Sequence, residues 1–544
     1  MNSGYPPSPA LGRRRFVQGL ALGGLAAGSG LWRPASALAG NVTAASLSKP
    51  TELRGQALHL GIGQSTVNFT GRQRPAITVN GSLPAPILRL REGDDVSIRV
   101  DNLLRDQPSS IHWHGLLLPA NMDGVPGLSF DGIAPGQSHL YRFQLRQSGT
   151  YWYHGHSMLQ EQNGLYGAIV IDPLQPPPYR YDREHVLLFS DWTDLEPIAL
   201  LHRLKRMPDY DNIHQRTVGN FIEDARREGL ARTLADRRMW GQMRMTPTDL
   251  SDVDGGTYTY LLNGVAPAGN WTGLFRSGEK VLLRLINGSA MTYFDFRIPG
   301  LKMTVVAADG QYVHPVTVDE LRIAAAETFD VIVEPSGQDA FTLFAQDMGR
   351  TGHACGTLAV SPGLRAEIPT LDPRPLLSMA DMGHGMHGLG SRMEDPGVGL
   401  RDNGRQVLRY ADLHSLFEDP DGRAPEREIE LRLTGNMERF AWSFDGVPFT
   451  AAEPLRLNYG ERMRMVLINE TMMSHPIHLH GMWSDLEDEQ QRFQLRKHTV
   501  DMPPGSRRSY RVRADALGRW AFHCHLLYHM ETGMMREVRV EENA

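Results

Sequence analysis

The chain has 544 residues, too many for one hydrophobic core, so we expect two to four domains. Its 55 glycines and 35 prolines, with short alternating apolar runs between them, favour a mostly β protein. Two cysteines exclude a disulfide framework, whereas histidine (21) and methionine (24) are plentiful. The formal net charge of −6 at pH 7 argues against nucleic acid as the main partner.

Residues 1–39 have the composition of a targeting segment. Arg13 and Arg14 precede a weakly apolar, Gly/Ala-rich stretch and a small-residue cleavage pattern near Ala37 or Ala39. This arrangement resembles a twin-arginine (Tat) export signal, which predicts the Tat machinery as a partner and the periplasm as the location. A membrane anchor is the alternative, but the run is short of the roughly 20 apolar residues that a span needs. No other segment is apolar enough to span, so we expect no stable membrane span once the signal is removed.

Three parts of the remaining chain repeat one pattern. The stretches "LRLREGDDVSIRV", "LFRSGEKVLLRLI" and "LRLNYGERMRMVLI" each place a Gly turn between two strands with alternating apolar residues. In two of the repeats a glycine and a histidine are 18 residues apart, Gly136 and His154 in one and Gly505 and His523 in the other. The repeats predict an all-β protein of three homologous Greek-key β-sandwich domains.

Proline-rich stretches and a segment of low complexity give the domain boundaries. Domain one takes residues 48–175, and domain two takes residues 180–362 with a partly helical insertion at 200–250. A linker with a Met/His-rich segment follows at 363–404, and domain three takes residues 405–544.

Four His-x-His pairs occur, two in domain one and two in domain three. Residues two apart on a strand point to the same face, so each pair can direct both imidazoles at one cluster. One pair would be weak evidence, because strands often carry exposed histidines, but four pairs in two matching domains favour a metal site. The pairs are His112/His114, His154/His156, His478/His480 and His523/His525. Domain two lacks them, so we expect a metal-free spacer there and the site where domains one and three meet.

Cys524 lies between the two histidines of the fourth pair and therefore points to the opposite face of its strand. His529 and Met534 follow it closely, and His475 precedes the third pair. One thiolate, two imidazoles and one thioether are the ligand set of a blue copper site. The alternative, a buried structural cysteine, leaves this spacing unexplained. The cysteine then connects two metal sites through its own backbone.

The motifs "HWHG", "WYHGH", "HPIHLHG" and "HCHLLYHMETGM" resemble the copper-binding signatures of multicopper oxidases, and the resemblance covers essentially the whole chain after the signal. It implies three cupredoxin-like domains and four copper ions: one type 1 ion, one type 2 ion and a type 3 pair. It places the type 1 ion on His475, Cys524, His529 and Met534. It places the type 2 ion on His112 and His478, and the type 3 pair on His114, His154, His156, His480, His523 and His525.

Within that family, stretches such as "MDGVPGLSFDGIAPG" and "SDWTD" resemble the bacterial copper-resistance protein A group. The resemblance implies a periplasmic enzyme that passes single electrons from a reductant through Cys524 and reduces O2 to water. Soft methionine donors favour Cu(I) as that reductant. Two alternatives stay open: a laccase-like phenol oxidase that uses the same coppers, and a copper-sequestering protein, against which the complete ligand set argues.

Two acids are candidates for catalysis. Asp123 matches a family acid that relays protons to oxygen, and reduction of O2 to water consumes protons. An aspartate that caps the turn before Gly124 is the alternative. A second family acid often directly follows the type 1 histidine. Met530 stands at that position here, so the neighbouring Glu531 is the candidate.

The remaining predictions concern methionine, cysteine and the other histidines. The Gly-rich segment at 378–393 is expected to be flexible and to capture Cu(I) weakly, with an ordinary linker as the alternative. Cys355 is expected to be a buried free thiol, and His498 is expected to be structural or on the surface. The donors of the segment are Met379, Met382, His384, Met386, His387 and Met393.

Overall fold

The computed structural model describes residues 51–542, apart from residue 244 and residues 383–388. The predicted export signal therefore lies outside the described residues. The described chain is mostly strand, which confirms the predicted all-β class. Its alternating burial explains why: in one strand of domain one, Val96, Ile98 and Val100 face the core while the residues between them lie at or near the surface.

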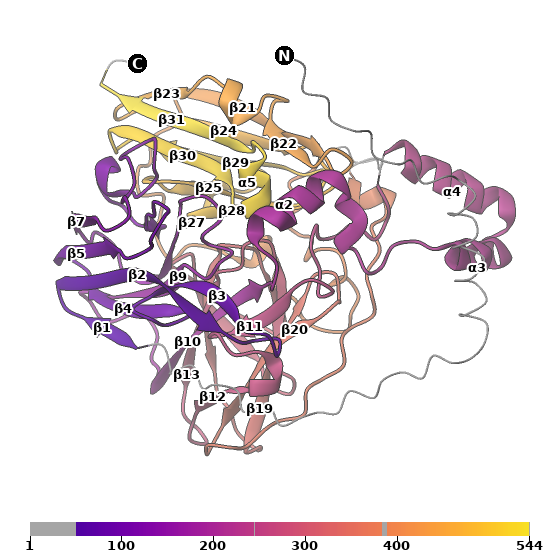
Figure 1. The fold of residues 1–544 in the computed structure, drawn as a ribbon, viewed down its shortest axis with the longest axis horizontal. Coiled ribbons are helices and arrows are strands. Elements are labelled where there is room, and N and C mark those ends of the chain that lie inside the picture. Colours follow the sequence, from indigo (N-terminus) through magenta and orange to yellow (C-terminus); the bar gives the residue numbers. More distant parts are fainter. Residues whose placement is uncertain (1–50, 244, 383–388, 543–544) are drawn as a thin grey trace, which may run out of the picture. The chain divides into compact units, whose positions relative to one another are not determined.

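Domain one contains two facing sheets, drawn from indigo to purple in Figure 1. The outer sheet has the order β3-β2-β5-β7 and the inner sheet the order β1-β4-β9-β8-β6. The strands are β1 (Glu52–Arg54), β2 (Ala57–Val67), β3 (Arg74–Val79), β4 (Ala85–Arg91), β5 (Asp95–Asn102), β6 (His112–His114), β7 (Ser138–Gln144), β8 (Gly149–His154) and β9 (Tyr166–Asp172).

Domain two has sheets of the orders β11-β10-β13-β18-β15-β16 and β12-β20-β19-β14-β17. The strands of the first are β10 (Arg183–Trp192), β11 (Thr259–Leu262), β13 (Val281–Asn287), β15 (Met303–Ala308), β16 (Gln311–Val318) and β18 (Thr328–Val333). Those of the second are β12 (Trp271–Leu274), β14 (Phe294–Arg297), β17 (Glu320–Ile323), β19 (Ala340–Asp347) and β20 (His353–Ala359).

Domain three repeats this plan in the orders β22-β21-β24-β29-β26-β27 and β23-β31-β30-β25-β28. The strands of the first sheet are β21 (Arg427–Asn436), β22 (Ala441–Phe444), β24 (Arg462–Asn469), β26 (Ser484–Glu487), β27 (Phe493–Lys497) and β29 (Arg507–Arg513). Those of the second are β23 (Leu455–Asn458), β25 (His475–Leu479), β28 (Thr499–Met502), β30 (Gly518–Cys524) and β31 (Met535–Glu541).

The repeated sheet orders make particular strands equivalent. The pair β6/β8 of domain one corresponds to β14/β19 of domain two and to β25/β30 of domain three. Where the first and third pairs carry histidines, the middle pair carries Phe294, Phe296 and Ala345, all buried. The same position in the fold therefore holds hydrophobic core in domain two.

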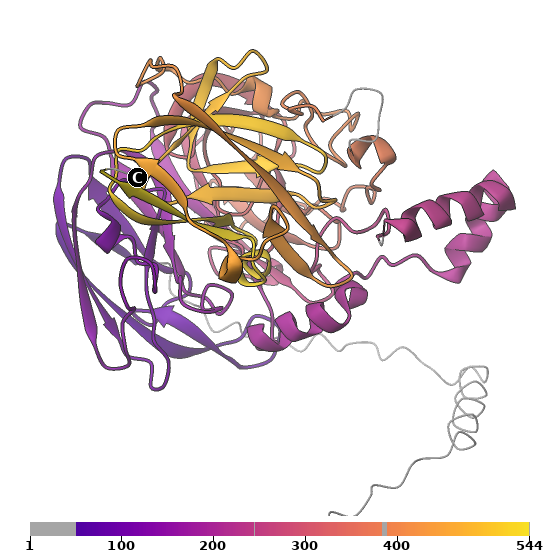
Figure 2. The same cartoon turned by 90° about the horizontal axis from the view of Figure 1, so that it is seen from above.

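Helices are few and lie mainly in the part of domain two predicted to be partly helical. Among the described residues the α-helices are α2 (Pro197–Arg206), α3 (Val218–Glu228), α4 (Leu230–Gln242) and α5 (Leu527–Glu531). Helix α2 buries Leu200, Leu201 and Leu204, so its apolar face fixes it to the body of the protein. Helices α3 and α4 pack against each other as a separate pair (Figures 1 and 2). None of the helices in the described part of the chain has the length and apolar character that a membrane crossing requires.

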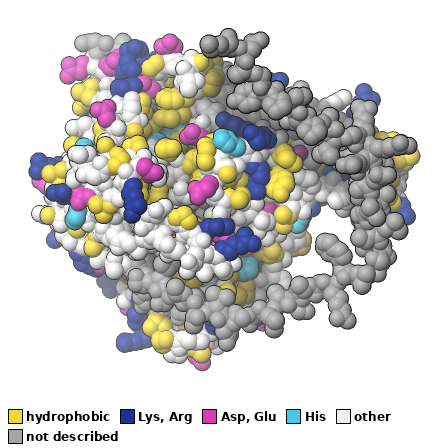
Figure 3. All heavy atoms as spheres, viewed as in Figure 1, with side chains coloured by type: hydrophobic (Ala, Val, Ile, Leu, Met, Phe, Trp, Pro, Cys, Tyr) yellow, Lys and Arg dark blue, Asp and Glu magenta, His cyan; other side chains and the backbone are white. Residues whose placement is uncertain are grey.

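The linker between domains two and three contacts both of them. The side-chain amide of Asn403 donates to a carboxylate oxygen of Glu320 in domain two at 2.9 Å, and an isolated bridge joins Gly390 to Ser506 in domain three. Met393, predicted to be a flexible copper donor, is only 3% exposed and belongs to the hydrophobic core, so that prediction is wrong for this residue. His384, Met386 and His387 lie outside the described residues. On the face that Figure 3 shows, acidic and basic side chains are mixed.

Candidate metal centre

Strand pairing brings the His-x-His pairs together within each domain. In domain one, His112 on β6 lies opposite His154 on β8. In domain three, His478 on β25 lies opposite His523 on β30. Each domain thus presents four histidines from two neighbouring strands and the residues that follow them.

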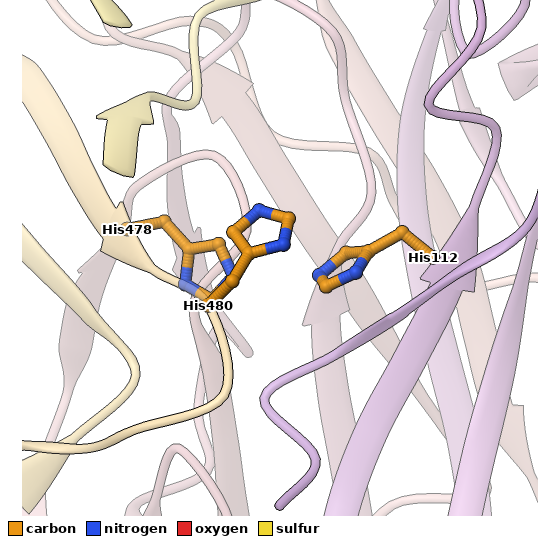
Figure 4. Close-up of side chains that lie close together, drawn as sticks. All are labelled: His112, His478 and His480. Carbon is orange, nitrogen blue, oxygen red and sulfur yellow. The ribbon is translucent and has the colours of Figure 1, made fainter. Parts of the chain in front are cut away.

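The two sets of histidines face each other across the boundary between domains one and three. The ring of His112 stacks on that of His480, with centroids 3.8 Å apart, and the ring of His114 stacks on that of His478 at 3.7 Å. Figure 4 shows His112 approaching His478 and His480 from the opposite side. The predicted meeting place of the two domains is therefore a histidine cluster with members from both.

The cluster divides into groups that the sequence could not separate. In each group the candidate ligand atoms lie within 4.8 Å of one another. Two groups together contain the six predicted type 3 ligands, and a third contains both predicted type 2 ligands. The groups are His114/His154/His525, His156/His480/His523 and His112/His478/His480, and a fourth group, His114/His478/His498, adds His498 to the cluster.

Backbone carbonyls orient several of these rings. The Nδ1–H of His112 donates to the carbonyl of Asp123 at 2.9 Å, and that of His478 donates to the carbonyl of His498 at 2.6 Å. The Nε2 atoms of both rings are then left as acceptors, buried and without a partner among the described residues. In His523, Nδ1 lies 2.9 Å from the Cys524 carbonyl, so Nε2 again faces the cluster. The fold therefore presents nitrogen lone pairs to a common space.

Burial keeps the cluster neutral. Burial is the largest cause that lowers the pKa of His523 to about 4. Burial also lowers the pKa values of the neighbouring histidines well below the usual value for histidine. Those neighbours are His114, His154, His156, His478, His480 and His525. Neutral imidazoles are the form that binds metal.

The second candidate site lies around Cys524. Its Sγ is 3.6 Å from Nδ1 of His475 and 3.8 Å from Nδ1 of His529, and all three side chains are fully buried. Met534 is also fully buried, and its carbonyl accepts the backbone N–H of Cys524 at 3.1 Å. Burial raises the pKa of the Cys524 thiol well above its usual value, so a bound cation is what would hold it as a thiolate.

The outer nitrogens of these two histidines are held in place. Nε2 of His475 lies 2.6 Å from the hydroxyl of Thr471, and Nε2 of His529 lies 2.8 Å from a carboxylate oxygen of Asp252. The ring of Trp442 stacks on that of His529 with centroids 4.1 Å apart. These contacts turn both Nδ1 atoms toward the thiol.

Copper fits the donors at both sites. The first site offers neutral imidazoles with unpartnered, buried nitrogens, and the second offers a thiol and two imidazoles, with the backbone of Met534 hydrogen-bonded to that of Cys524. Imidazole and soft sulfur ligands of this kind suit copper. Several of these nitrogens are buried and have no hydrogen-bond partner among the described residues. A buried polar atom without a partner lowers stability, and a bound metal ion would provide that partner.

Asp123 lies inside the cluster. Its Oδ2 is 2.8 Å from Nδ1 of His480, its Oδ1 is 3.2 Å from Nδ1 of His112, and its side chain is 1% exposed. The residue ends the short 3-10 helix η1 (Ala120–Met122). Its carboxylate contacts the two histidines. Its position suits the predicted proton relay better than turn capping.

Glu531, the second predicted acid, shares a cavity with one histidine of the cluster. It ends α5, is exposed, and lines an open cavity of about 390 Å³ together with His156, Met158 and Met530. Partial burial raises the pKa of its carboxyl, and Lys205 opposes this rise. The structure thus places the second predicted acid at the mouth of a cavity that reaches the cluster.

Sequence reasoning missed three residues next to the candidate ligands. Asp252 contacts His529 from domain two, which is therefore more than a spacer. A carboxylate oxygen of Glu161 lies 2.7 Å from Nδ1 of His154. The predicted structural role of His498 is compatible with its full burial, but its ring centroid is only 4.7 Å from that of His114. Asp252 and His498 meet these ligands from distant parts of the chain, whereas Glu161 follows His154 by only seven residues, in a stretch that no local motif marks.

The second cysteine is remote from this chemistry. Cys355 is a free thiol, fully buried, as expected, and burial raises its pKa to about 11. Its Sγ lies 3.9 Å from the carbonyl of Pro267. We find no role for it in the candidate sites.

Comparisons with known proteins agree with the geometry. Family models described as multicopper oxidase match residues 61–176, 183–362 and 422–544. The chain is 58% identical to a copper resistance protein A homolog of Pseudomonas syringae pv. tomato and 55% identical to copper resistance protein A of Escherichia coli. Each alignment covers 97% of this chain and 99% of the relative.

Solved structures share the fold at lower identity. Fet3p, a multicopper oxidase that functions in iron import, superposes with a TM-score of 0.67 at 21% identity, covering 90% of this chain and 91% of that one. The laccase from Botrytis aclada gives a TM-score of 0.67 at 22% identity, covering 91% and 89%. These likenesses support the cupredoxin-like fold.

Proposed function

Because the chain belongs to the multicopper oxidase family, we propose that it oxidises Cu(I) and reduces O2 to water as a periplasmic copper-resistance enzyme. One observation carries the proposal. The thiol of Cys524 lies between two imidazoles, while the residues on either side of it, His523 and His525, belong to the histidine cluster. A single strand end thus joins a site that suits electron uptake to a site that suits O2 reduction.

The donor groups support four copper ions, which together supply one-electron redox chemistry between the reductant and O2. The type 1 ligands are His475, Cys524, His529 and Met534. The type 2 ligands are His112 and His478. The type 3 pair is held by the groups His114/His154/His525 and His156/His480/His523.

The residues around the cluster orient the donors and handle protons. The carbonyls of Asp123 and His498 fix the ring tautomers of two ligands, so no proton has to leave their Nε2 atoms when metal binds. The Oδ1 atom of Asp123 has no hydrogen-bond partner that meets strict geometry among the described residues. It is the atom at which we place proton transfer to the products of O2 reduction.

The surroundings of the type 1 residues favour a cation over a phenol as the reductant. His475 and His529 are fully buried, so any reductant passes its electron through the residues that cover them. The outer nitrogen of His529 is covered by Asp252, a carboxylate that attracts positive charge. The names of the relatives, copper resistance protein A, point the same way.

Oxygen consumption tests the choice of reductant. The purified, copper-loaded enzyme is given either Cu(I), under a competing chelator, or a simple phenol, and an oxygen electrode records the steady-state rate. We expect a higher kcat/KM for Cu(I). A higher value for the phenol would support the laccase-like alternative, and no O2 consumption with either would support copper sequestration.

The location has its own test. If residues 1–39 act as a Tat signal, replacing Arg13 and Arg14 with lysine leaves the precursor in the cytoplasm, because the pathway depends on the arginine pair. Cell fractionation measures this directly. Normal accumulation of the variant in the periplasm would show that Tat is not the route.

A further inference from the structure

We propose that Glu161 is a positioning residue for the type 3 copper pair, and that domain two holds it against His154. The inference rests on the proposed function, since it concerns ligands assigned there. The carboxylate oxygen Oε2 lies 2.7 Å from Nδ1 of His154, and the two residues are 3% and 1% exposed. The carbonyl of Gly155 also lies near this nitrogen, but at 3.1 Å.

The contact decides which nitrogen of His154 faces the metal. A carboxylate accepts the Nδ1–H, so the lone pair is on Nε2. That Nε2 lies 3.4 Å from Nε2 of His525, the ligand that domain three contributes to the same group. Two such nitrogens facing each other at this distance suit a shared metal ion.

The two halves of the proposed pair are built alike. In the group His156/His480/His523, the carboxylate of Asp123 lies 2.8 Å from Nδ1 of His480. In the group His114/His154/His525, Glu161 makes the matching contact. Each group therefore contains one imidazole held by a buried carboxylate, which strengthens it as a donor.

Domain two fixes the chain next to Glu161. The amide Nε2 of Gln162 donates to the carbonyl of Asp191 at 3.1 Å, and its Oε1 accepts the hydroxyl of Tyr258 at 2.5 Å. The carboxylate of Asp191 in turn accepts the backbone N–H groups of Ala290 and Met291, each at 3.0 Å. The metal-free domain thus sets the position of a contact to the cluster.

Fold stability does not explain this glutamate. Its second oxygen, Oε1, is buried and has no hydrogen-bond partner among the described residues. A buried polar atom of this kind costs free energy of folding. Residues that break the rules of stability in this way are expected at functional sites.

Two variants test the inference. Glu161→Gln keeps an oxygen acceptor of nearly the same shape but loses the charge, and Glu161→Leu loses both. Glu453→Gln, on the exposed Glu453, is the matched control. For each protein we would measure copper per chain after dialysis against graded chelator, the near-ultraviolet absorption and electron paramagnetic resonance of the copper pair, the blue absorption, and the melting temperature of the copper-free form.

We expect Glu161→Leu to weaken copper retention at the pair by about 10–100-fold, the usual effect of losing such an outer partner. Glu161→Gln should lose less. The near-ultraviolet band should fall and new paramagnetic copper signals should appear, while the blue absorption stays. The copper-free Glu161→Gln protein should melt no lower than the wild type, because the amide keeps the size and the oxygen acceptor of the buried side chain.

Other outcomes would contradict the positioning role of Glu161 or the proposed function on which it rests. Wild-type copper retention and near-ultraviolet absorption in Glu161→Leu would refute the positioning role. A copper-free Glu161→Gln protein that melts lower, with normal retention of the pair, would show that the residue serves the fold. If the wild type itself lacks a coupled copper pair, the proposed function fails and not this inference alone.

Discussion

At the scale of single residues, Cys524 explains how one strand serves two sites. Its side chain reaches His475 and His529, and its carbonyl lies 2.9 Å from Nδ1 of His523 in the cluster. Alternation along the strand makes this division unavoidable, because neighbouring side chains point to opposite faces.

Cys524→Ser should abolish the blue absorption and nearly all oxidase activity while the protein still folds. Serine is close to cysteine in size, but its hydroxyl is not a soft thiolate ligand. Visible absorption, oxygen uptake and circular dichroism of the purified variant measure the three effects. Intense blue absorption in this variant would contradict the type 1 assignment.

Asp252 offers a second prediction at this scale. Its carboxylate accepts the Nε2–H of His529 at 2.8 Å. The neutral variant Asp252→Asn should therefore hold the imidazole ring in place less firmly and should attract Cu(I) less strongly. We expect the blue absorption to remain and Cu(I) oxidation to slow by about tenfold or more. Asp95→Asn, at an exposed position, is the control. Equal rates for the two variants would exclude a role for Asp252 in electron uptake.

At the scale of elements, the short strand β6 and the strand β25 carry the predicted type 2 ligands. His112 and His478 face the cluster through Nε2, and neither contacts Cys524. The two strands come from different domains, so each contributes one half of the site.

His112→Ala should therefore stop O2 reduction and leave the blue absorption intact. Oxygen uptake and visible spectra of the copper-loaded variant provide the test, and copper per chain should fall by about one ion, as expected when one site loses a ligand. Loss of the blue absorption with continued turnover would reverse the assignment of the two sites.

The linker gives a prediction of its own. Met393 is core, so Met379, Met382 and Met386 are the remaining candidate thioether donors for Cu(I). Replacing these three with leucine should raise the KM for Cu(I) several-fold, because thioethers bind Cu(I) and leucine does not. Phenol turnover and blue absorption should stay unchanged. An unchanged KM, measured by oxygen electrode under chelator, would leave the segment a spacer.

At the scale of the whole molecule, domains one and three are joined by a cluster of neutral, buried histidines. Burial lowers the pKa of His523 and of His498 to about 4. Between the ordinary histidine value of 6.5 and these values, the unfolded chain binds protons that the folded chain does not. Stability from these groups is therefore present above pH 6.5 and is lost as the pH falls toward 4.

We expect the copper-free protein to lose up to about 1.4 kcal/mol of unfolding free energy per pH unit for each such histidine in that window. Copper binds the folded state and should raise the melting temperature at pH 7, with the gain shrinking in acid as protons compete for the ligands. Calorimetry of both forms from pH 7.5 to 5 tests this. A melting temperature of the copper-free form that is independent of pH would contradict it.

Much of the architecture could be predicted from the sequence because its signals are local. Alternating apolar residues and Gly turns specify strands, and the three-fold repetition of that pattern indicated three sandwiches of one kind. The His-x-His pairs and the placement of Cys524 also follow from the geometry of a single strand, since residues two apart share a face. Candidate ligands and the metal class could therefore be predicted from single strands, whereas the assignment of ligands to individual copper ions came from the resemblance to the family.

Only the tertiary structure decided how these parts combine. It divided the six predicted type 3 histidines into two groups, placed Met393 in the core, and brought Glu161 and Asp252 to the outer nitrogens of two ligands. Asp252 lies 277 residues before the histidine it contacts. The Asp252 contact arises from the packing of domain two against domain three, and the Glu161 contact from the course of the chain after β8. No periodicity within one segment records which carboxylate will meet which imidazole.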